Sequence, residues 1–305
     1  MSEVYHIPAM LQETIEGLAI KPDGIYVDVT FGGGGHSRAI LERMCSIGDL
    51  SLDNGHLYSF DQDADALRNA IDDERWTFVH SNFRYLRNWM DYYGVENIDG
   101  LLADLGVSFH HFDCPERGFS FRFSAPLDMR MNQTAKRTAA DIVNGYSEEE
   151  LAKILYMYGE LKNGRGIARN ICRARTQKPI ERTEDLVAAS RIPAEMSKEL
   201  ARLFQALRIE VNDEMGALRE MLVAARDLLK PGGRIAILTY HSLEDRLVKN
   251  FLRSGNLEGT IEKDFYGNNL SPFEVIEKGR EANKEEVEQN PRARSAKLRV
   301  AEKKV

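Results

Sequence analysis

"YVDVTFGGGGHSRAIL", from Tyr26 to Leu41, places four consecutive glycines between a short apolar run and an amphipathic segment. Glycine loses more conformational freedom on folding than any other residue, so such a run needs a reason. After a strand, it lets the backbone approach a ligand closely, and the helix that follows points its unpaired amides at that ligand. The stretch therefore predicts a strand, a turn that holds a nucleotide-like cofactor and a helix; the alternative is a loop that only needs small residues.

The first third of the chain repeats this alternation of strand and helix. Short apolar or alternating runs occupy residues 24–30, 55–61, 76–81 and 98–106, and apolar residues at helical spacing occupy residues 37–44, 63–72 and 83–94. Alternation at this spacing is typical of βαβ units, which form a parallel sheet covered on both faces. The sequence thus predicts a doubly wound α/β domain.

The alternation of strand and helix patterns ends at about Asn132, where helical patterns follow one another without strand signals. Ser147 and Glu150 have the spacing of a capping box at a helix start. A strand pattern returns at residues 232–242 and a β-like stretch at 294–302, whereas the polar residues 278–294 are expected to form an exposed loop. These observations predict one α/β domain in two parts, residues 1–131 and 207–305, interrupted by an all-helical insert, residues 132–206.

Composition narrows the class of protein. The chain has 305 residues, of which 43% are hydrophobic, as in an ordinary globular protein. Its three cysteines, Cys45, Cys114 and Cys172, are too scattered for a disulfide framework or a zinc site, so we expect free thiols, no metal and a reducing compartment. With no signal-like leader and no membrane-length apolar run, the expected location is the cytoplasm, away from membranes. A net charge of −7 means that any nucleic-acid partner must be held by local basic patches.

Two carboxylates indicate which cofactor the glycine turn holds. Asp28 ends the first predicted strand, where an acid suits a cofactor that carries a cation near the turn and is less suited to a pyrophosphate. Asp61 ends the second predicted strand and is placed to accept hydrogen bonds from ribose hydroxyls. Together they favour S-adenosylmethionine, which has a cationic amino-acid end and an adenosine end, over NAD.

The fourth predicted strand ends in "LLADLGVS", which contains Asp104 and Ser108. In an open α/β sheet, ligands bind outside the carboxyl ends of the strands, so both residues should face the same crevice as Gly34. Asp104 could orient an acceptor or take its proton. The alternative is that Asp104 only caps the loop that follows.

A long loop from Phe109 to Asn132 combines aromatic residues with arginines. Loops of this length in compact domains are usually functional or disordered, and disordered segments seldom carry so many aromatic residues. We expect most of the loop's phenylalanines to form a small core and its arginines, Arg117, Arg122 and Arg130, to be the candidate contacts with the bases and phosphates of a nucleic acid.

Segments distributed over almost the whole chain resemble one family. They include "HIPAMLQETIEGL", "VDVTFGGGGHS", "LLADLGVSFHHFDCPERGFSFR", "PLDMRMN", "FQALRIEVNDE" and "LKPGGRIAILTYHSLEDRLVK", in the order found in the bacterial small-subunit (16S) ribosomal RNA cytosine-N4 methyltransferase family. The resemblance implies a class I, Rossmann-like methyltransferase domain with an inserted helical domain. It also implies transfer of a methyl group from S-adenosylmethionine to the exocyclic amine of one cytosine in the decoding region of 16S rRNA.

The resemblance also implies functional residues. The positions that match the family's cofactor contacts are Gly34, Gly35, His36, Asp61, Phe83 and Asp104. A further position, usually Gln in "SSPQLD", is His111 in this chain's "SFHHFD". Histidine offers fewer hydrogen-bonding sites than an amide, so this contact is expected to differ.

Methylation of cytosine N4 needs an acceptor close to the amine, because its lone pair is delocalised into the ring. The chain lacks the Asp/Asn/Ser-Pro-Pro-aromatic tetrapeptide of many amino methyltransferases. Asp104 or Ser108 is therefore the expected acceptor. In "HSLEDR", His241 and Glu244 are candidates for the substrate pocket. Alternatively, the segment only starts a helix, with Ser242 as its cap and the negative charge of Asp245 stabilising its N-terminus.

Cationic residues gather in two places despite the acidic total. The insert contributes Lys162, Arg165, Arg169, Arg173, Arg175 and Lys178, and the end of the chain contributes Arg292, Arg294, Lys297, Arg299, Lys303 and Lys304. Because acids are nearly absent from the first cluster, we expect it to bind RNA phosphates, with 16S rRNA presented within the small subunit. An NAD-dependent oxidoreductase and a non-catalytic assembly factor are the alternatives, and both a monomer and a homodimer are compatible with the sequence.

Overall fold

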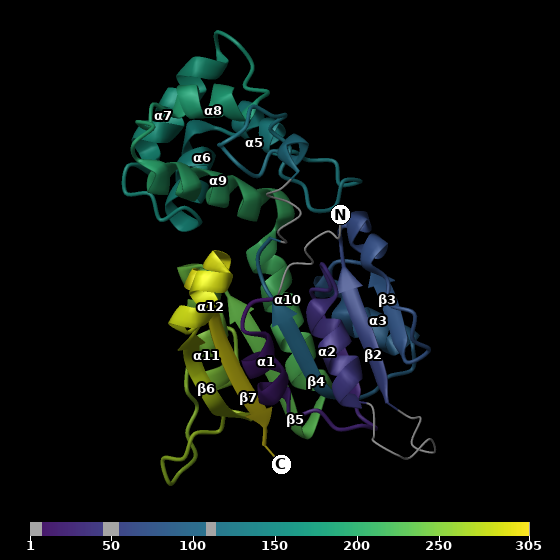
Figure 1. Cartoon of the computed structure of the whole chain (residues 1–305). Helices are drawn as coiled ribbons and strands as arrows, with labels where there is room; N and C mark the ends of the chain where they lie inside the picture. The colour runs from purple at the N-terminus through teal and green to yellow at the C-terminus, as the bar shows by residue number, and fades with distance from the viewer. Residues whose placement is uncertain (1–7, 45–54, 108–113, 305) are drawn as a thin grey trace. The chain divides into compact units, whose positions relative to one another are not determined.

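The computed structural model of the protein describes residues 8–44, 55–107 and 114–304. The chain divides into two compact units (Figure 1). The first unit consists of Met1–Gly106 together with Gly216–Val305, and the second of Val107–Met215. A sheet organises the first unit, and helices form the second.

Seven strands form the sheet of the first unit in the order β3-β2-β1-β4-β5-β7-β6. They are β1 (Ile25–Asp28), β2 (His56–Asp61), β3 (Trp76–His80), β4 (Ile98–Asp104), β5 (Leu229–Thr239), β6 (Phe273–Glu281) and β7 (Lys297–Lys303). The strands β1 to β5 pair in parallel, and β7 runs antiparallel to both β5 and β6. The carboxyl ends of the parallel strands therefore share one edge, and the strand order reverses between β1 and β4, where open α/β sheets bind ligands.

Helices bury the faces of the sheet. The helices of the first unit are α1 (Leu11–Leu18), α2 (Gly35–Met44), α3 (Leu86–Tyr92), α10 (Glu214–Leu228), which starts at the boundary, α11 (Ser242–Ser254) and α12 (Lys284–Gln289). Ile15 of α1 and Ile40 of α2 share a buried core with Leu102 of β4 and Leu238 of β5. Strands β1 and β4 are buried along most of their length, as expected for parallel strands covered on both faces. The predicted doubly wound α/β fold is confirmed.

Two local predictions for this unit differ from the structure, the first in the type and length of the helix and the second in kind. Residues 63–72, expected to be helical, form a tight 3-10 turn over Ala64–Asn69, which begins where the Asp63 side chain accepts a hydrogen bond from the amide of Asp65. Residues 278–294, expected to form a loop, contain the end of β6 and all of α12. β6 is an edge strand that pairs with β7 through its backbone, so it needs no apolar alternation of its own.

Helices form the second unit: α5 (Ala139–Gly145), α6 (Glu148–Met157), α7 (Gly164–Arg175), α8 (Thr183–Ser190) and α9 (Ser197–Asn212). The predicted capping box at the start of α6 is confirmed: the Glu150 amide donates to Ser147 Oγ at 3.2 Å, and the Ser147 amide donates to Glu150 Oε2 at 2.7 Å. Across the described residues, no helix is both long enough and apolar enough to span a membrane.

The loop before the helices belongs to the second unit. Phe119, Leu127, Met129 and Met131 are buried in the same apolar cluster as residues of α5 to α9. Their burial fixes the loop to the helices and explains why this unit begins at residue 107. The expected insert, residues 132–206, lies inside these boundaries.

Candidate active site

The glycine turn joins β1 to α2 at the carboxyl edge of the sheet. Gly34 has φ +74°, and its amide donates to the Phe31 carbonyl at 2.7 Å. A Cβ atom at Gly34 would lie 2.7 Å from Arg38 Nη1 and 2.9 Å from two carbons of the Phe31 ring. Arg38 Nη1 in turn donates to the Gly33 carbonyl at 2.7 Å. Both the backbone conformation and the neighbouring side chains therefore require glycine at this position.

Two features of the turn fit a bound ligand. An added Cβ at Gly33 would meet no atom of the described residues within 4 Å, so among these residues the backbone there is open to a neighbour. At Gly35, the same atom would lie 2.3 Å from Pro8 Cγ, so that side of the turn is filled by protein. Next to it, His36 Nε2 is buried and has no hydrogen-bond partner among the residues that the structure describes. A buried, unpaired ring nitrogen beside an open backbone is a suitable surface for a polar cofactor.

Asp28 stabilises the turn from beneath. Its side chain is fully buried and accepts hydrogen bonds from Ser37 Oγ at 2.6 Å and the Thr30 amide at 3.0 Å. Burial raises the pKa of this carboxyl to about 6, and its hydrogen bonds oppose the shift. Since every atom of Asp28 is covered by protein, its expected effect on a cofactor acts through the turn and through its charge.

Asp61 and Phe83 lie at the same edge. Asp61, the last residue of β2, accepts hydrogen bonds from the Gly32 amide at 2.8 Å and the Asp63 amide at 2.9 Å, and it stays partly exposed. It therefore links the second strand to the glycine turn. Phe83 is half-buried in a short 3-10 turn, Phe83–Tyr85, that follows β3. The structure thus brings these two predicted cofactor residues to the edge that carries the turn.

Asp104 ends β4, next to β1 in the sheet. Its amide donates to Thr30 Oγ1 at 2.6 Å, and its Oδ1 accepts a hydrogen bond from the Tyr240 hydroxyl at 2.7 Å. The side chain keeps 23% of its surface exposed, yet the surrounding protein desolvates it enough to raise its pKa to about 7. The negative charges of Asp28 and Glu244 add to this shift, and the hydrogen bond from Tyr240 opposes it. A carboxylate with a pKa near 7 is suited to taking up a proton at neutral pH.

His36 lies beside Asp104 without forming an ion pair at neutral pH. The distance from His36 Nδ1 to Asp104 Oδ2 is 3.8 Å, which is too long for a hydrogen bond. Burial lowers the pKa of His36 to about 4, so the ring is neutral under physiological conditions. The site consequently holds acidic groups and a neutral imidazole.

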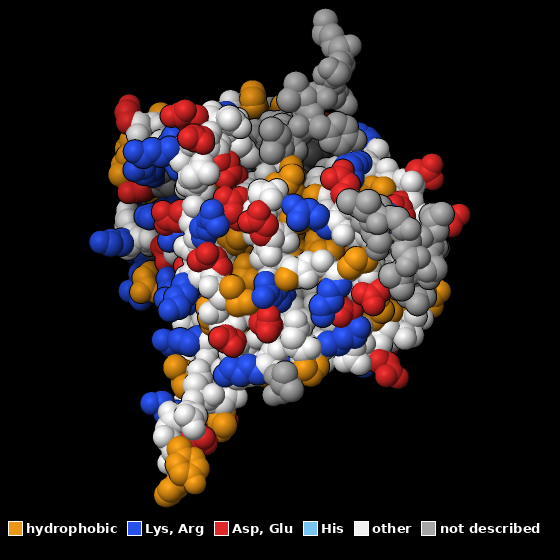
Figure 2. Space-filling view, turned by 60° about the horizontal axis from the view of Figure 1, so that its bottom comes forward, with side chains coloured by type: hydrophobic (Ala, Val, Ile, Leu, Met, Phe, Trp, Pro, Cys, Tyr) orange, Lys and Arg blue, Asp and Glu red, His pale blue; other side chains and the backbone are white. Residues whose placement is uncertain are grey.

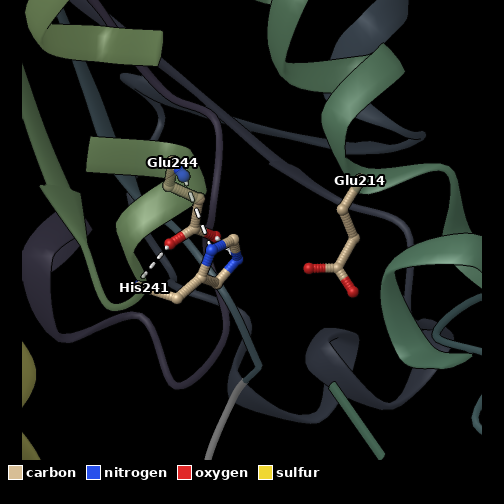
Figure 3. Close-up of side chains that lie close together, drawn as sticks. All are labelled: Glu214, His241 and Glu244. Carbon is tan, nitrogen blue, oxygen red and sulfur yellow. Dashed lines mark hydrogen bonds and ion pairs between the residues drawn. The ribbon is translucent and has the colours of Figure 1, made fainter. Parts of the chain in front are cut away.

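His241 and Glu244 form the start of α11. His241 is the N-cap residue, and the Glu244 carboxylate accepts hydrogen bonds from the amides of Tyr240 at 2.9 Å and His241 at 3.3 Å. Figure 3 shows the imidazole of His241 turned toward Glu244, whose Oε1 lies 3.1 Å from Nε2. The geometry matches the helix-start interpretation, except that Ser242 is the first helical residue rather than the cap. Contact of the pair with substrate stays a prediction.

The three predicted arginine contacts belong to the second unit and differ in their surroundings. Arg117 is buried, and its Nη2 donates to the Arg130 and Met131 carbonyls at 2.8 and 3.1 Å. Arg130 forms a bidentate pair with Asp128 at 2.8 and 2.7 Å. Both side chains hold the loop together, whereas Arg122 is exposed and is the better placed of the three to reach RNA. Ser108 and His111 lie outside the described residues.

Sequence reasoning missed Tyr240. It stands in "TYHSLEDR", directly before the candidates His241 and Glu244, and was not among the expected site residues. In the structure, this hydroxyl is the side-chain donor to Asp104, from a position 136 residues further along the chain. Desolvation raises the pKa of Tyr240 well above its usual value, so the hydroxyl remains a donor. The only available signal was one polar atom at the end of the fifth strand.

Replacing Tyr240 with Phe is expected to shift the pH profile of turnover upward. The substitution removes the hydrogen bond that lowers the pKa of Asp104, so this pKa rises above about 7. Because an ionised carboxylate is needed to accept a proton, turnover then declines at a higher pH as the solution is acidified, and recovers at alkaline pH. The measurement is kcat against pH, with Tyr92→Phe, an exposed tyrosine, as the control. Superimposable profiles for Tyr240→Phe and wild type would contradict this role.

The strand order, the glycine turn and the acids at the strand ends define a class I methyltransferase fold. The chain belongs to the MraW methylase family, whose family model matches residues 3–304.

Full-length relatives agree with this assignment. A protein of Parabacteroides distasonis named ribosomal RNA small subunit methyltransferase H is 59% identical over 98% of this chain and 97% of its own length. A protein of the same name from Phocaeicola vulgatus is 57% identical over 99% of this chain and 98% of its own length. The solved structure of an rRNA methylase from Streptococcus thermophilus aligns with 100% of this chain at 13% identity and TM-score 0.43, which is too low to add to the assignment.

Proposed function

We propose that the protein transfers a methyl group from S-adenosylmethionine to the N4 amine of a cytosine in the decoding region of 16S ribosomal RNA. The observation that carries the proposal is a desolvated carboxylate with a pKa of about 7, Asp104, beside a glycine turn in a chain of the MraW methylase family. The names of the relatives support small-subunit rRNA as the substrate. An NAD-dependent oxidoreductase is not favoured, since the turn is surrounded by acids that a pyrophosphate would avoid.

The residues around the turn would hold the cofactor, which supplies an activated methyl group on a cationic sulfonium. In this proposal Gly33, Gly34 and His36 contact it, and Asp61 accepts hydrogen bonds from its ribose. Asp28 and Asp104 provide negative charge nearby. The low pKa of His36 fits the same arrangement, because a neutral imidazole adds no positive charge beside a cation.

Asp104 would handle the amine and its proton. Oδ1 is occupied by the hydrogen bond from Tyr240, which orients the carboxylate. Oδ2 can then accept a hydrogen bond from an N–H of the cytosine amine, which favours a pyramidal nitrogen with a more available lone pair. As the nitrogen gained the methyl carbon, the bond between that carbon and the sulfur would break with its electron pair left on sulfur, and the nitrogen would then lose one proton to Asp104 or to water.

A basic stripe on the second unit is suited to RNA. We define the α7 stripe as Arg165, Arg169 and Arg173, whose spacing of four residues places them on one face of α7, and all three are exposed. Arg169 also forms an ion pair with Glu148, in which Nε lies 3.3 Å from Oε1. Exposed cations on one face of a helix are suited to binding a nucleic-acid strand through its phosphates.

Four of the other cations already have partners within their own units. Within the first cluster, Arg175 Nη1 donates to the Val143 carbonyl at 2.6 Å, and Lys178 pairs with Asp185 at 2.9 Å. In the C-terminal cluster, Arg299 is buried against Asp245 at 2.8 Å, and Lys297 pairs with Glu281 at 3.2 Å. These side chains stabilise their own units, so the proposal assigns RNA binding to the α7 stripe.

The double substitution Arg165→Ala and Arg173→Ala is expected to weaken RNA binding and its salt dependence together. Each lost phosphate contact should reduce the slope of log affinity against log salt by about 1. The measurement is binding of 16S rRNA at several salt concentrations, with Arg87→Ala in the first unit as the control. An unchanged slope would show that the α7 stripe does not contact phosphates.

The function as a whole can be tested directly. The protein is incubated with labelled S-adenosylmethionine and small ribosomal subunits that lack the modification, and the labelled nucleotide and atom are then mapped. Label on N4 of one decoding-region cytosine is the expected result. Such an activity would place the protein in the cytoplasm, where these subunits are assembled. Binding of the particle without transfer would instead support an assembly factor.

A further inference from the structure

An aromatic pair protrudes from the first unit. We define the 256–272 loop as the segment between α11 and β6; in it, Phe265 is 97% exposed and Tyr266 is 85% exposed. Figure 1 shows the segment extending from β6 at the lower left, and Figure 2 shows a projection there with hydrophobic side chains at its tip. The two rings lie edge to face at 5.6 Å. Neighbouring aromatic side chains so fully exposed to water mark an interaction site more often than a structural one.

The tip of the loop is ordered by its own hydrogen bonds. The Asp264 carboxylate accepts from the amides of Tyr266 and Asn268, each at 2.8 Å, and from Asn268 Nδ2 at 2.8 Å. Gly267, at φ +87°, donates to the Asp264 carbonyl at 3.0 Å. The Leu270 amide closes the loop on the Glu262 carbonyl at 2.9 Å. The backbone that carries the rings is thus set before any partner arrives, which lowers the entropy cost of binding.

The net negative charge of the 256–272 loop favours a basic partner over an anionic one. Residues 256–272 contain three acids, Glu258, Glu262 and Asp264, and one base, Lys263, for a net charge of −2. Hydrogen bonds from Asn268 lower the pKa of Asp264, so it remains ionised at neutral pH. RNA phosphates and anionic lipids would be repelled by this segment, whereas a basic protein would be attracted to it.

The loop is also remote from the active site within the sheet. β6 runs antiparallel to β7, and its first residue, Phe273, pairs with Lys303 at the end of β7. β7 is antiparallel to β5, so the 256–272 loop lies at the amino edge of the parallel strands. Asp28, Asp61 and Asp104 lie at the opposite edge. A contact made by Phe265 and Tyr266 is therefore separate from binding of the cofactor and the target base.

We propose that Phe265 and Tyr266 insert into an apolar pocket on a basic protein of the small ribosomal subunit. The choice of this particle rests on the proposed function. The contact makes the assembled subunit a better ligand than its RNA alone, and it positions the enzyme through protein as well as through RNA.

The test compares the two sources of affinity. Full-length wild type and the double variant Phe265→Ser and Tyr266→Ser are titrated with purified small subunits and, separately, with protein-free 16S rRNA at the same salt concentration. The expected result is an affinity for subunits lower by about tenfold or more, since buried aromatic anchors dominate such interfaces, with unchanged affinity for the free RNA. Tyr92→Ser, which removes an exposed aromatic residue elsewhere in the first unit, is the matched control and should change neither affinity.

Other outcomes would overturn the inference. Equal losses of affinity for subunits and free RNA would assign the rings to RNA, and no loss for either would remove them from substrate binding. If sedimentation showed a wild-type dimer that the double variant cannot form, the partner would be a second copy of the chain. Because these readouts are binding and mass, they remain interpretable even if no methyl transfer to 16S rRNA is found.

Discussion

Replacing Asp104 with Asn is expected to lower kcat by about two to four orders of magnitude. An amide presents an N–H group as well as an oxygen, and it takes up no proton near pH 7. The variant keeps the shape of the side chain and an oxygen that can accept from Tyr240, so the fold and the turn should persist. The loss therefore measures proton acceptance and alignment of the amine rather than a collapse of the site.

Two measurements make this prediction specific. Single-turnover rates with small subunits give the chemical step, and equilibrium binding of S-adenosylmethionine shows whether the site is intact. Asp72→Asn, a change at an exposed aspartate, is the control. Since the pKa of Asp104 is raised to about 7, wild-type turnover should also decline as the pH falls below about 7, because protonation removes the acceptor. Near-normal turnover in Asp104→Asn with intact cofactor binding would exclude Asp104 from catalysis.

Replacing Gly34 with Ala is expected to lower the affinity for S-adenosylmethionine by about a hundredfold. The added Cβ would lie 2.9 Å from the Phe31 ring and 2.7 Å from Arg38 Nη1, so the backbone must shift. A residue with a side chain also resists φ +74°, at a cost of about 1–2 kcal/mol. The rest of the expected loss comes from the displaced turn, whose backbone would no longer be preorganised for the cofactor.

The matched control for Gly34→Ala is Gly145→Ala. The same methyl group added at Gly145, the last residue of α5, meets no atom within 4 Å in the described part of the chain. Cofactor affinity is measured by calorimetry and the free energy of unfolding by denaturant titration. Wild-type affinity in Gly34→Ala would mean that the cofactor does not depend on this turn.

The local features of the first unit could be predicted because each is encoded within a few residues. Short apolar or alternating runs identified β1 to β5, and the acids that end β1, β2 and β4 lie at one edge because parallel strands end together. The capping box at Ser147 is a similar case, since both of its hydrogen bonds join residues three apart. The same local logic failed at β6, whose pairing with β7 depends on a distant strand.

In the site, too, the identity of residues could be read from local sequence, whereas their environment depends on tertiary contacts. Asp104 could be found as an acid at the end of a strand, but its pKa depends on burial and on Tyr240, Asp28 and Glu244. Asp28 could be found in the same way, but only the structure shows that its side chain is fully buried and accepts a hydrogen bond from Ser37. Arg117 and Arg130 were expected to contact RNA, and their guanidinium groups are used to hold their own loop.

The sequence by itself determined the α/β alternation, the glycine turn and the carboxylates at the strand ends, because side-chain periodicity and backbone freedom act over short distances along the chain. Only the tertiary structure decided that Tyr240 orients Asp104, that the loop before Asn132 packs into the helical unit, and that Phe265 and Tyr266 protrude from an ordered turn. Burial and hydrogen bonding depend on which segments meet in space, and residues 136 positions apart leave no local pattern that records their contact.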